Sequence, residues 1–369
     1  MGHSTDSKHN PDSPAEPPAG APGAIHAPGN GGNNAALTVQ ITLNAVLAAI
    51  ETGEPKVLCT DDKAGTIALP YGPFDPVRHR TFEVGLRDWV NRQTRVSPGY
   101  VEQLYTFGDR GREAPLGGDP DDQPSPNPSQ SGDLPNHLVS VGYLALAPAP
   151  AAVNVADAKW RNWYQFFPWE DWRGGEPEIL AQVILPVLKD WIDQAGDKRA
   201  ALLTRVRTAF GFTETGWEEE RILERFELMF QAGLVLEAHA IDEGLSSSTA
   251  TPCGLAMASD HRRILATAIG RLRGKLKYRP ILYDMVPNEF TLLDLQTRVE
   301  AISGFALHKQ NFRRMVENSG QIEPTGGHSS AAGGRPAALF CVNRASIADR
   351  ADKGLTIPRL KRRPSFDIQ

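Results

Sequence analysis

Apolar residues near the end of the chain recur at the three- and four-residue spacing of an amphipathic helix. They are Leu292, Leu295, Val299 and Ile302. Thr291 and Asp294 have the Thr-x-x-Asp spacing of a capping box, in which the two side chains bond the free amides at a helix start. Gly304 is expected to end this helix, because glycine adopts the left-handed conformation of a C-cap at low cost.

A second helix is predicted at about residues 308–319, and two β-prone runs follow it at 321–325 and 337–342. A glycine-rich loop at 326–334 joins the two runs. Two helices and a hairpin in this order predict a winged helix-turn-helix. In such folds the second helix enters the major groove of DNA and the wing lies along the backbone or the minor groove.

The predicted second helix buries one face and leaves polar and basic residues on the other. The residues expected to contact DNA are Thr291, Lys309, Gln310, Asn311, Arg313, Arg314 and, in the wing, Arg335. Two alternatives stay open. The basic face can be an ordinary solvated surface, and Arg313 or Arg314 can instead pair with Glu317.

Charge is distributed unevenly along the chain. Residues 259–369 hold 19 Lys and Arg against 10 Asp and Glu, a net of +9, whereas the other 258 residues hold 20 against 34, a net of −14. A basic module attached to an acidic body is typical of DNA-binding proteins. The distribution therefore favours DNA binding over the solvated helical hairpin.

Residues 1–35 are rich in Pro, Gly, Ser and Asn, so we predict a disordered tail. Strand-like runs at 37–48, 56–60, 66–69, 101–107 and 137–146 surround an amphipathic helix at 81–94. This pattern predicts an α+β domain at 36–172. Its last stretch, 160–172, is dense in aromatic residues, which indicates either buried core or a surface on which bases stack.

The rest of the chain is predicted to be helical up to the winged helix. We expect a helical insertion at 173–258, with helices at 179–195 and 217–239, and a connecting helix within 259–283. The winged helix-turn-helix is assigned to 284–345 and a basic tail to 346–369. At 369 residues, such a division into several domains is ordinary.

Composition excludes several classes of protein. Three widely separated cysteines without CxxC spacing argue against a disulfide framework and against a structural zinc site, and we expect no metal. No apolar run approaches the roughly 18 residues of a membrane span. We therefore expect a cytoplasmic bacterial protein that has no membrane partner.

The segment from Leu69 to Thr94 resembles the Nudix box, G-x5-E-x7-R-E-U-x-E-E-x-G-U, where U is bulky and apolar. Arg87, Asp88 and Trp89 fall on the arginine, the acid and the apolar position that follow each other in the box. Asn91 and Arg92 stand where the paired glutamates belong. Nudix hydrolysis needs those carboxylates to hold divalent cations against a pyrophosphate, so the resemblance implies a fold without catalytic residues.

Further segments resemble the Nudix-related transcriptional regulators, in which a Nudix-like domain precedes a winged helix. They include Tyr105–Asp109, Val139–Tyr143, Phe290–Leu292, Asn311–Arg314 and Gly334–Ala337. The resemblance implies a homodimeric repressor of NAD-biosynthesis genes on a palindromic double-stranded operator. The insertion is absent from the compact members and suggests the NadQ-like branch, which leaves ADP-ribose, ATP and NAD open as the adenine-nucleotide effector.

Without a metal, cations must meet the phosphate charge of such an effector. The candidate effector-binding residues are Arg78, Arg80, Arg87, Asp109 and Tyr143, the last two as ribose or base contacts. Two other functions remain as alternatives. One is a Nudix-type nucleoside-diphosphate hydrolase with an accessory winged helix, and the other is a protein–protein adaptor.

Overall fold

The computed structural model describes residues 39–63, 65–109, 137–147, 150, 153, 155, 157–239, 253–278, 281–329, 336–349, 364–365 and 368. The predicted tail at 1–35 and most of the predicted basic tail at 346–369 lie outside these residues. None of the described helices is both long and apolar enough to cross a membrane.

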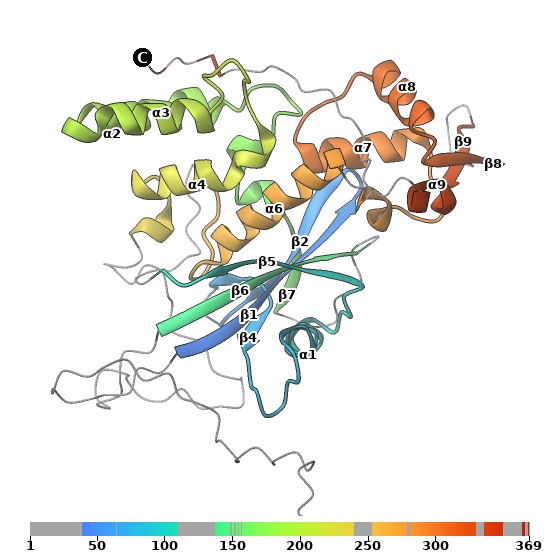
Figure 1. Cartoon of the computed structure of the whole chain (residues 1–369), viewed down its shortest axis with the longest axis horizontal. Helices are drawn as coiled ribbons and strands as arrows, with labels where there is room; N and C mark the ends of the chain where they lie inside the picture. The colour runs from blue at the N-terminus through green and yellow to red at the C-terminus, as the bar shows by residue number, and fades with distance from the viewer. Residues whose placement is uncertain are drawn as a thin grey trace, which may run out of the picture. The chain divides into compact units, whose positions relative to one another are not determined.

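A mixed β-sheet forms the N-terminal half (Figure 1). Its strands are β1 (Val39–Glu51), β2 (Glu54–Asp61), β3 (Ile67–Ala68), β4 (Tyr71–Pro73), β5 (Tyr100–Phe107), β6 (His137–Leu146) and β7 (Ala158–Asn162). The order is β3-β2-β1-β6-β5, with β4 also on β1 and β7 also on β2. β1 and β6 are parallel, and the other pairs are antiparallel.

Alternate residues of β1 supply two separate cores. Leu43, Ala45 and Leu47 pack with Leu86 and Val90 of α1 (Phe82–Thr94). Val46, Ala48 and Ile50 belong to the other core, which includes Ile264, Ala268 and Leu272 of α6 (His261–Tyr278). The sheet therefore lies between α1 and α6, as the alternation of side chains along a strand buried on both faces requires (Figure 1).

The region between the sheet and α6 is helical, as predicted. A π-helical turn (Leu180–Ile184) runs directly into α2 (Leu185–Asp193), and α3 (Arg199–Ala209) and α4 (Ile222–Gln231) follow. The same region contains short 3-10 turns at Trp163–Gln165, Pro168–Glu170, Gly196–Lys198, Glu219–Arg221 and Leu236–Ala238. The helix predicted at 217–239 is shorter in the structure, because Gly233 turns the chain with a φ of 70°.

The aromatic run at 160–172 is core rather than a stacking surface. Trp163, Phe166, Phe167 and Trp169 are all essentially without exposure. Its first residues form the end of β7, a strand that the sequence pattern did not predict, because five residues are too few to give a clear periodic signal. The core interpretation is thus confirmed.

The C-terminal segment is a winged helix-turn-helix, and the predicted α+β fold class is confirmed. After a 3-10 turn (Ile281–Met285) it comprises α7 (Leu292–Ser303), α8 (Lys309–Ser319), β8 (Ile322–His328), β9 (Ala338–Val342) and α9 (Arg344–Asp349). Thr291 and Asp294 form the predicted capping box. Gly304 ends α7 and Gly320 ends α8, both in the left-handed conformation.

A buried carboxylate between two guanidinium groups joins these parts. Glu170 Oε1 accepts from Arg225 Nε of α4 at 2.6 Å, and Glu170 Oε2 accepts from Arg273 Nη1 of α6 at 2.6 Å. All three side chains have 0% exposure. Burial raises the pKa of the Glu170 carboxyl, but the two arginines outweigh burial and hold that pKa below its usual value.

A variant without the Glu170 carboxylate should unfold at a markedly lower denaturant concentration than the wild type. We expect Glu170→Ala to cost about 3–5 kcal/mol of unfolding free energy, because it leaves two buried guanidinium groups without a counter-charge. Equilibrium denaturation measures this cost. Glu178→Ala is the matched control: that carboxylate is exposed, and its loss should change stability by less than about 0.5 kcal/mol.

The pH dependence follows from the lowered pKa of Glu170. A depressed carboxyl pKa contributes stability that is fully present above its unfolded value of about 4.3 and is lost as pH falls through the folded value. The stability difference between wild type and Glu170→Gln should therefore be constant at neutral pH and shrink in acid. A difference that grows in acid would contradict the assigned charge.

Candidate nucleic-acid interface and effector site

Helix α8 presents a polar face to solvent. Phe312 and Val316 are buried beneath it. Five of the residues predicted to contact DNA lie on this helix with exposed side chains: Lys309, Gln310, Asn311, Arg313 and Arg314. The fold thus brings these five together on one surface, as a recognition helix requires.

The two remaining candidates differ from these five. The Thr291 hydroxyl accepts from the Asp294 amide at 3.1 Å and donates to the Asp294 carboxylate at 2.9 Å, so it already serves the capping box of α7. Arg335 lies outside the described residues. Thr291 therefore caps α7, and the exposed hydrogen-bond donors of this region lie on α8.

Only part of the positive charge in residues 259–369 is free of ion pairs within the described structure. Each of the six Lys and Arg residues of α6 pairs with an acid from the part of the chain before residue 259. Arg262 pairs with Glu237, Arg263 with Glu227, Arg271 and Lys275 with Glu102, Arg273 with Glu170, and Lys277 with Glu219 and Glu220. The basic excess of this helix therefore balances the acidic body and is not available to attract phosphates.

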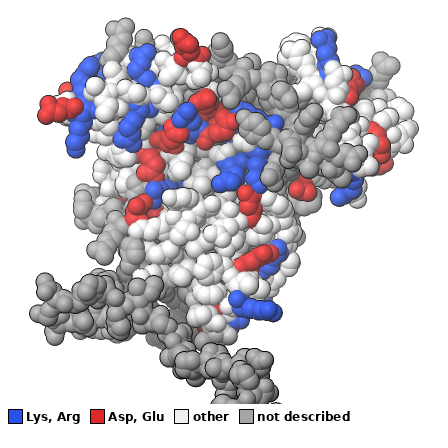
Figure 2. Space-filling model, in the orientation of Figure 1, with Lys and Arg blue, Asp and Glu red and all other residues white. Residues whose placement is uncertain are grey.

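Consistent with this pairing, basic and acidic side chains are interspersed over the helical region on the face shown in Figure 2. Residues 282–342 hold 5 Lys and Arg against 6 Asp and Glu. The positive charge on the exposed face of α8 comes from Lys309, Arg313 and Arg314.

The candidate effector residues do not form one cluster. Arg87 of α1 donates to Glu83 and to the backbone carbonyls of Pro98 and Gly99, so it holds the loop before β5. Tyr143 is 5% exposed in the core beneath α1, and burial raises the pKa of its hydroxyl. Asp109 instead pairs with Arg263 of α6, which covers the other face of the sheet.

Arg78 and Arg80 lie in the loop before α1. Both side chains are exposed, and Arg78 pairs with Asp75 at 3.4 Å. Of the five candidates, these two arginines have the guanidinium groups best placed to meet a phosphate from solvent.

The residues at the Nudix-box positions hold one another. Asp88 accepts from Arg92 at 2.8 Å and lies 3.4 Å from the buried His79 ring, while Asn91 donates to Ser97 at 3.4 Å. Among the described residues no three His, Cys, Asp or Glu side chains converge into a metal-binding group. The donor set at this helix does not fit the divalent cations of Nudix hydrolysis.

A surface groove of about 920 Å³ lies between β5, α6 and the 3-10 turn before α4. Four glutamates and three cations line it, together with Tyr100 and two glycines: Glu102, Glu218, Glu220, Glu224, Arg221, Arg271, Lys275, Gly270 and Gly274. Each of the three cations is already paired with one of these glutamates. This groove is therefore a poor site for a nucleotide, whose phosphates need unpaired cations.

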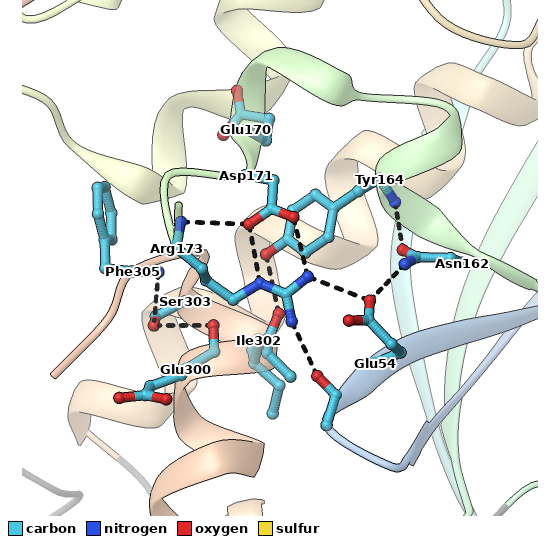
Figure 3. Close-up of polar contacts among 12 residues, drawn as sticks. Glu54, Asn162, Tyr164, Glu170, Asp171, Arg173, Glu300, Ile302, Ser303 and Phe305 are labelled. Atoms are coloured by element: carbon cyan, nitrogen blue, oxygen red, sulfur yellow. Dashed lines mark hydrogen bonds and ion pairs between the residues drawn. The ribbon is translucent and has the colours of Figure 1, made fainter. Parts of the chain in front are cut away.

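The C-terminal end of α7 is bound to the segment that follows β7 (Figure 3). Tyr164 donates its hydroxyl to the Ala301 carbonyl at 2.8 Å. Arg273 of α6 donates to the Ile302 carbonyl at 3.0 Å. Both bonds occupy carbonyls that a helix end leaves free. Sequence analysis missed these residues, because their partners are more than 25 positions away.

The hairpin between β1 and β2 contacts the same junction. Arg173 bonds the Gly53 carbonyl at 2.8 Å, Glu54 at 3.1 Å and Asp171 at 2.8 Å (Figure 3). Arg298 of α7 donates to the Ile50 carbonyl at 3.4 Å. The hairpin, the aromatic run and α7 are thus fixed to one another.

Residues 282–342 match the family model described as the NrtR DNA-binding winged helix domain. This segment is therefore similar to the winged helix of the NrtR proteins. A curated relative from Acinetobacter baylyi, the ADPR responsive transcriptional repressor NtrR, is 41% identical over 86 residues. That alignment covers 23% of this chain and 34% of the relative, so it spans about a third of the relative's length.

Two solved structures from Shewanella oneidensis are also similar. NrtR complexed with a 27mer DNA aligns at 20% identity with a TM-score of 0.48, covering 86% of this chain and 99% of that one. The Nudix domain of NrtR complexed with ADP ribose aligns at 25% identity with a TM-score of 0.28, covering 36% of this chain and 79% of that one. We draw no residue correspondence from either.

The contact between the winged helix and the Glu170 segment can be tested at Gly304. Its φ is 81°, and a Cβ there would collide with the Glu170 carbonyl oxygen and lie 3.0 Å from the Tyr164 hydroxyl. Gly326 has a φ of 80° with nothing within 4 Å, so it is the matched control. Left-handed strain costs about 1–2 kcal/mol at both sites.

We expect Gly304→Ala to lose an additional 1–3 kcal/mol or so of unfolding free energy, because the packed carbonyl must move. Chemical denaturation of the two variants measures the difference. Equal losses at the two positions would show that α7 is not packed tightly against the Glu170 segment.

Proposed function

We propose that this protein is a DNA-binding transcriptional repressor of NAD-biosynthesis genes, in which the N-terminal Nudix-like domain senses an adenine nucleotide. The observation on which the proposal depends is the NrtR-type winged helix at 282–342, whose α8 exposes Lys309, Gln310, Asn311, Arg313 and Arg314. A relative described as an ADPR responsive transcriptional repressor supports it.

A homodimer would place two copies of α8 in successive major grooves of a palindromic operator. Arginine side chains at the middle of α8 would reach base edges, and Lys309 and Arg335 would meet phosphates. Thr291 would bring the α7 N-terminus to the backbone. Because the cations of α6 are paired within the protein, few cations would contact phosphates. The affinity for DNA would therefore depend largely on contacts to base edges.

ADP-ribose, ATP or NAD would act as a ligand and not as a substrate. Asp88 is the one acid at an acidic position of the box, and it is engaged by Arg92 and His79. Arg78 and Arg80, the exposed arginines before α1, are the best placed of the candidates to receive phosphates. Arg87, Asp109 and Tyr143 would act by holding the surrounding structure.

Helix α6 is the physical link between nucleotide and DNA. It packs on the sheet through Ile264 and Ala268, and its Arg273 bonds both Glu170 and the last turn of α7. A nucleotide that shifts α6 would therefore rotate the winged helix as a body. It can do so only if it binds two arrangements of the dimer with different affinity.

Gel-shift titration on promoter DNA of NAD-biosynthesis genes tests the proposal. We expect the double variant Arg313→Ala/Arg314→Ala to bind at least about tenfold more weakly than wild type, because a base contact and a phosphate contact are lost. One of ATP, NAD and ADP-ribose should change the wild-type affinity. Sequence-independent or absent binding by wild-type protein would favour the adaptor alternative.

Lys189→Ala/Arg199→Ala is the matched control for this titration. Both cations are exposed. Lys189 of α2 and Arg199 at the start of α3 each pair with Asp193. The control removes the same charge from the helical insertion and should leave the affinity for DNA within about twofold, given that only cations near the phosphates contribute.

A hydrolysis assay addresses the enzyme alternative. With Mg²⁺ and either ADP-ribose or NADH, we expect no turnover above the rate of the Asp88→Ala variant, because the described residues bring together no set of carboxylates that could hold the cation. Mg²⁺-dependent product formation that the Asp88→Ala change abolishes would instead support a Nudix-type hydrolase with an accessory winged helix.

A further inference from the structure

Helix α8 carries an ion pair on its exposed face. Arg313 Nε donates to Glu317 Oε1 at 2.8 Å, one helical turn further along the chain, and the two side chains are 66% and 44% exposed. The neighbouring Arg314 has no hydrogen-bond or ion-pair partner among the described residues. Two adjacent arginines of one recognition helix therefore differ: one guanidinium is held and the other is free.

Helix stability does not account for this pair. Exposed pairs four residues apart are weak, and the favourable order places the acid nearer the N-terminus, so that both charges complement the helix dipole. Here the order is reversed, and Glu317 lies in the last turn of α8, where a negative charge is disfavoured. A carboxylate on a surface that meets phosphates would also weaken binding. Glu317 thus carries two costs on this helix.

The geometry of the pair suggests what offsets those costs. A guanidinium whose Nε is engaged still presents its two terminal nitrogens side by side. That pair of donors matches the O6 and N7 acceptors of guanine in the major groove, the commonest specific contact of arginine with DNA. A carboxylate that holds Nε limits the rotamers of the side chain before binding, so less conformational entropy is lost when the base is bound.

We propose that Glu317 is a positioning residue for specificity: it holds Arg313 in the orientation that reads a guanine, while Arg314 contacts a phosphate. The inference rests on the proposed DNA-binding function and deepens it. It assigns sequence discrimination to Arg313 and Glu317 together, and sequence-independent affinity to Arg314.

The test begins with selection of binding sequences from a random duplex DNA library by the full-length wild-type protein. Affinities are then measured for the selected consensus and for each single base change in one half-site. The variants are Glu317→Ala, Glu317→Gln, Arg313→Ala and Arg314→Ala. Because all three side chains are exposed, thermal unfolding should be nearly unchanged and serves as the folding control.

We expect Glu317→Ala and Arg313→Ala to lose discrimination at the same guanine by about tenfold. Glu317→Ala should bind non-consensus DNA as tightly as wild type or more tightly, because a negative charge is removed. Glu317→Gln should keep most of the discrimination, since its amide oxygen also accepts from Nε. Arg314→Ala should weaken all sequences alike and lower the salt dependence by about one phosphate contact.

Two results would overturn the inference while leaving the DNA-binding function intact. Glu317→Ala could retain full discrimination, which would make the pair incidental, or Arg313→Ala could weaken every sequence equally, which would make Arg313 a phosphate contact. Failure of the wild-type protein to select any sequence would instead contradict the proposed function itself, and this inference with it.

Discussion

The buried group of Glu170, Arg225 and Arg273 constrains the rest of the structure. Three charges without solvent exposure are stable only if each finds its counter-charge and its remaining hydrogen bonds inside the protein. The backbone carbonyls of Ala209, Glu219 and Ile302 supply those bonds. Separation of any of these elements would leave a bare charge in an apolar interior. The sheet domain, the insertion, α6 and α7 are therefore expected to move together and not to loosen one by one.

The insertion has a clear physical role in this arrangement. Its acidic residues Glu219, Glu220, Glu227 and Glu237 neutralise cations of α6, and its Arg225 completes the bonds of Glu170. A single buried apolar cluster runs from Val46 of the sheet through the insertion to Val316 of α8. These helices between residues 174 and 239 thus support α6, which contacts both the sheet and α7.

Helix α1 is held against the sheet by contacts of its own side chains. Gln93 bonds both the amide and the carbonyl of Tyr71, and Trp89 donates to the Pro73 carbonyl, so the helix is tied to β4. Gly72 is required there, because a Cβ would overlap the Trp89 ring. These packing contacts do not involve Asn91 and Arg92, the amide and the guanidinium that stand where the resemblance to the Nudix box places paired glutamates.

Local rules were sufficient for the winged helix and for most of the strands. The capping box at Thr291, the left-handed glycines at 304 and 320, and the spacing of Phe312 and Val316 depend on residues within one or two helical turns. The exposure of the α8 candidates followed from the same periodicity. The aromatic run was read as core or surface, and only the fold of the sheet against the helices decided between them.

The pairing of charges could not be read from the chain, because it joins residues far apart in sequence. Glu170 and Arg273 are 103 positions apart, and Asp109 and Arg263 are 154 apart. A count of charges records the basic excess of residues 259–369. It does not record that the cations of α6 form ion pairs with acids from earlier in the chain. Periodicity and capping involve neighbouring residues, so they can be predicted from the sequence. The partner of a long side chain depends instead on which surfaces the folded chain brings together.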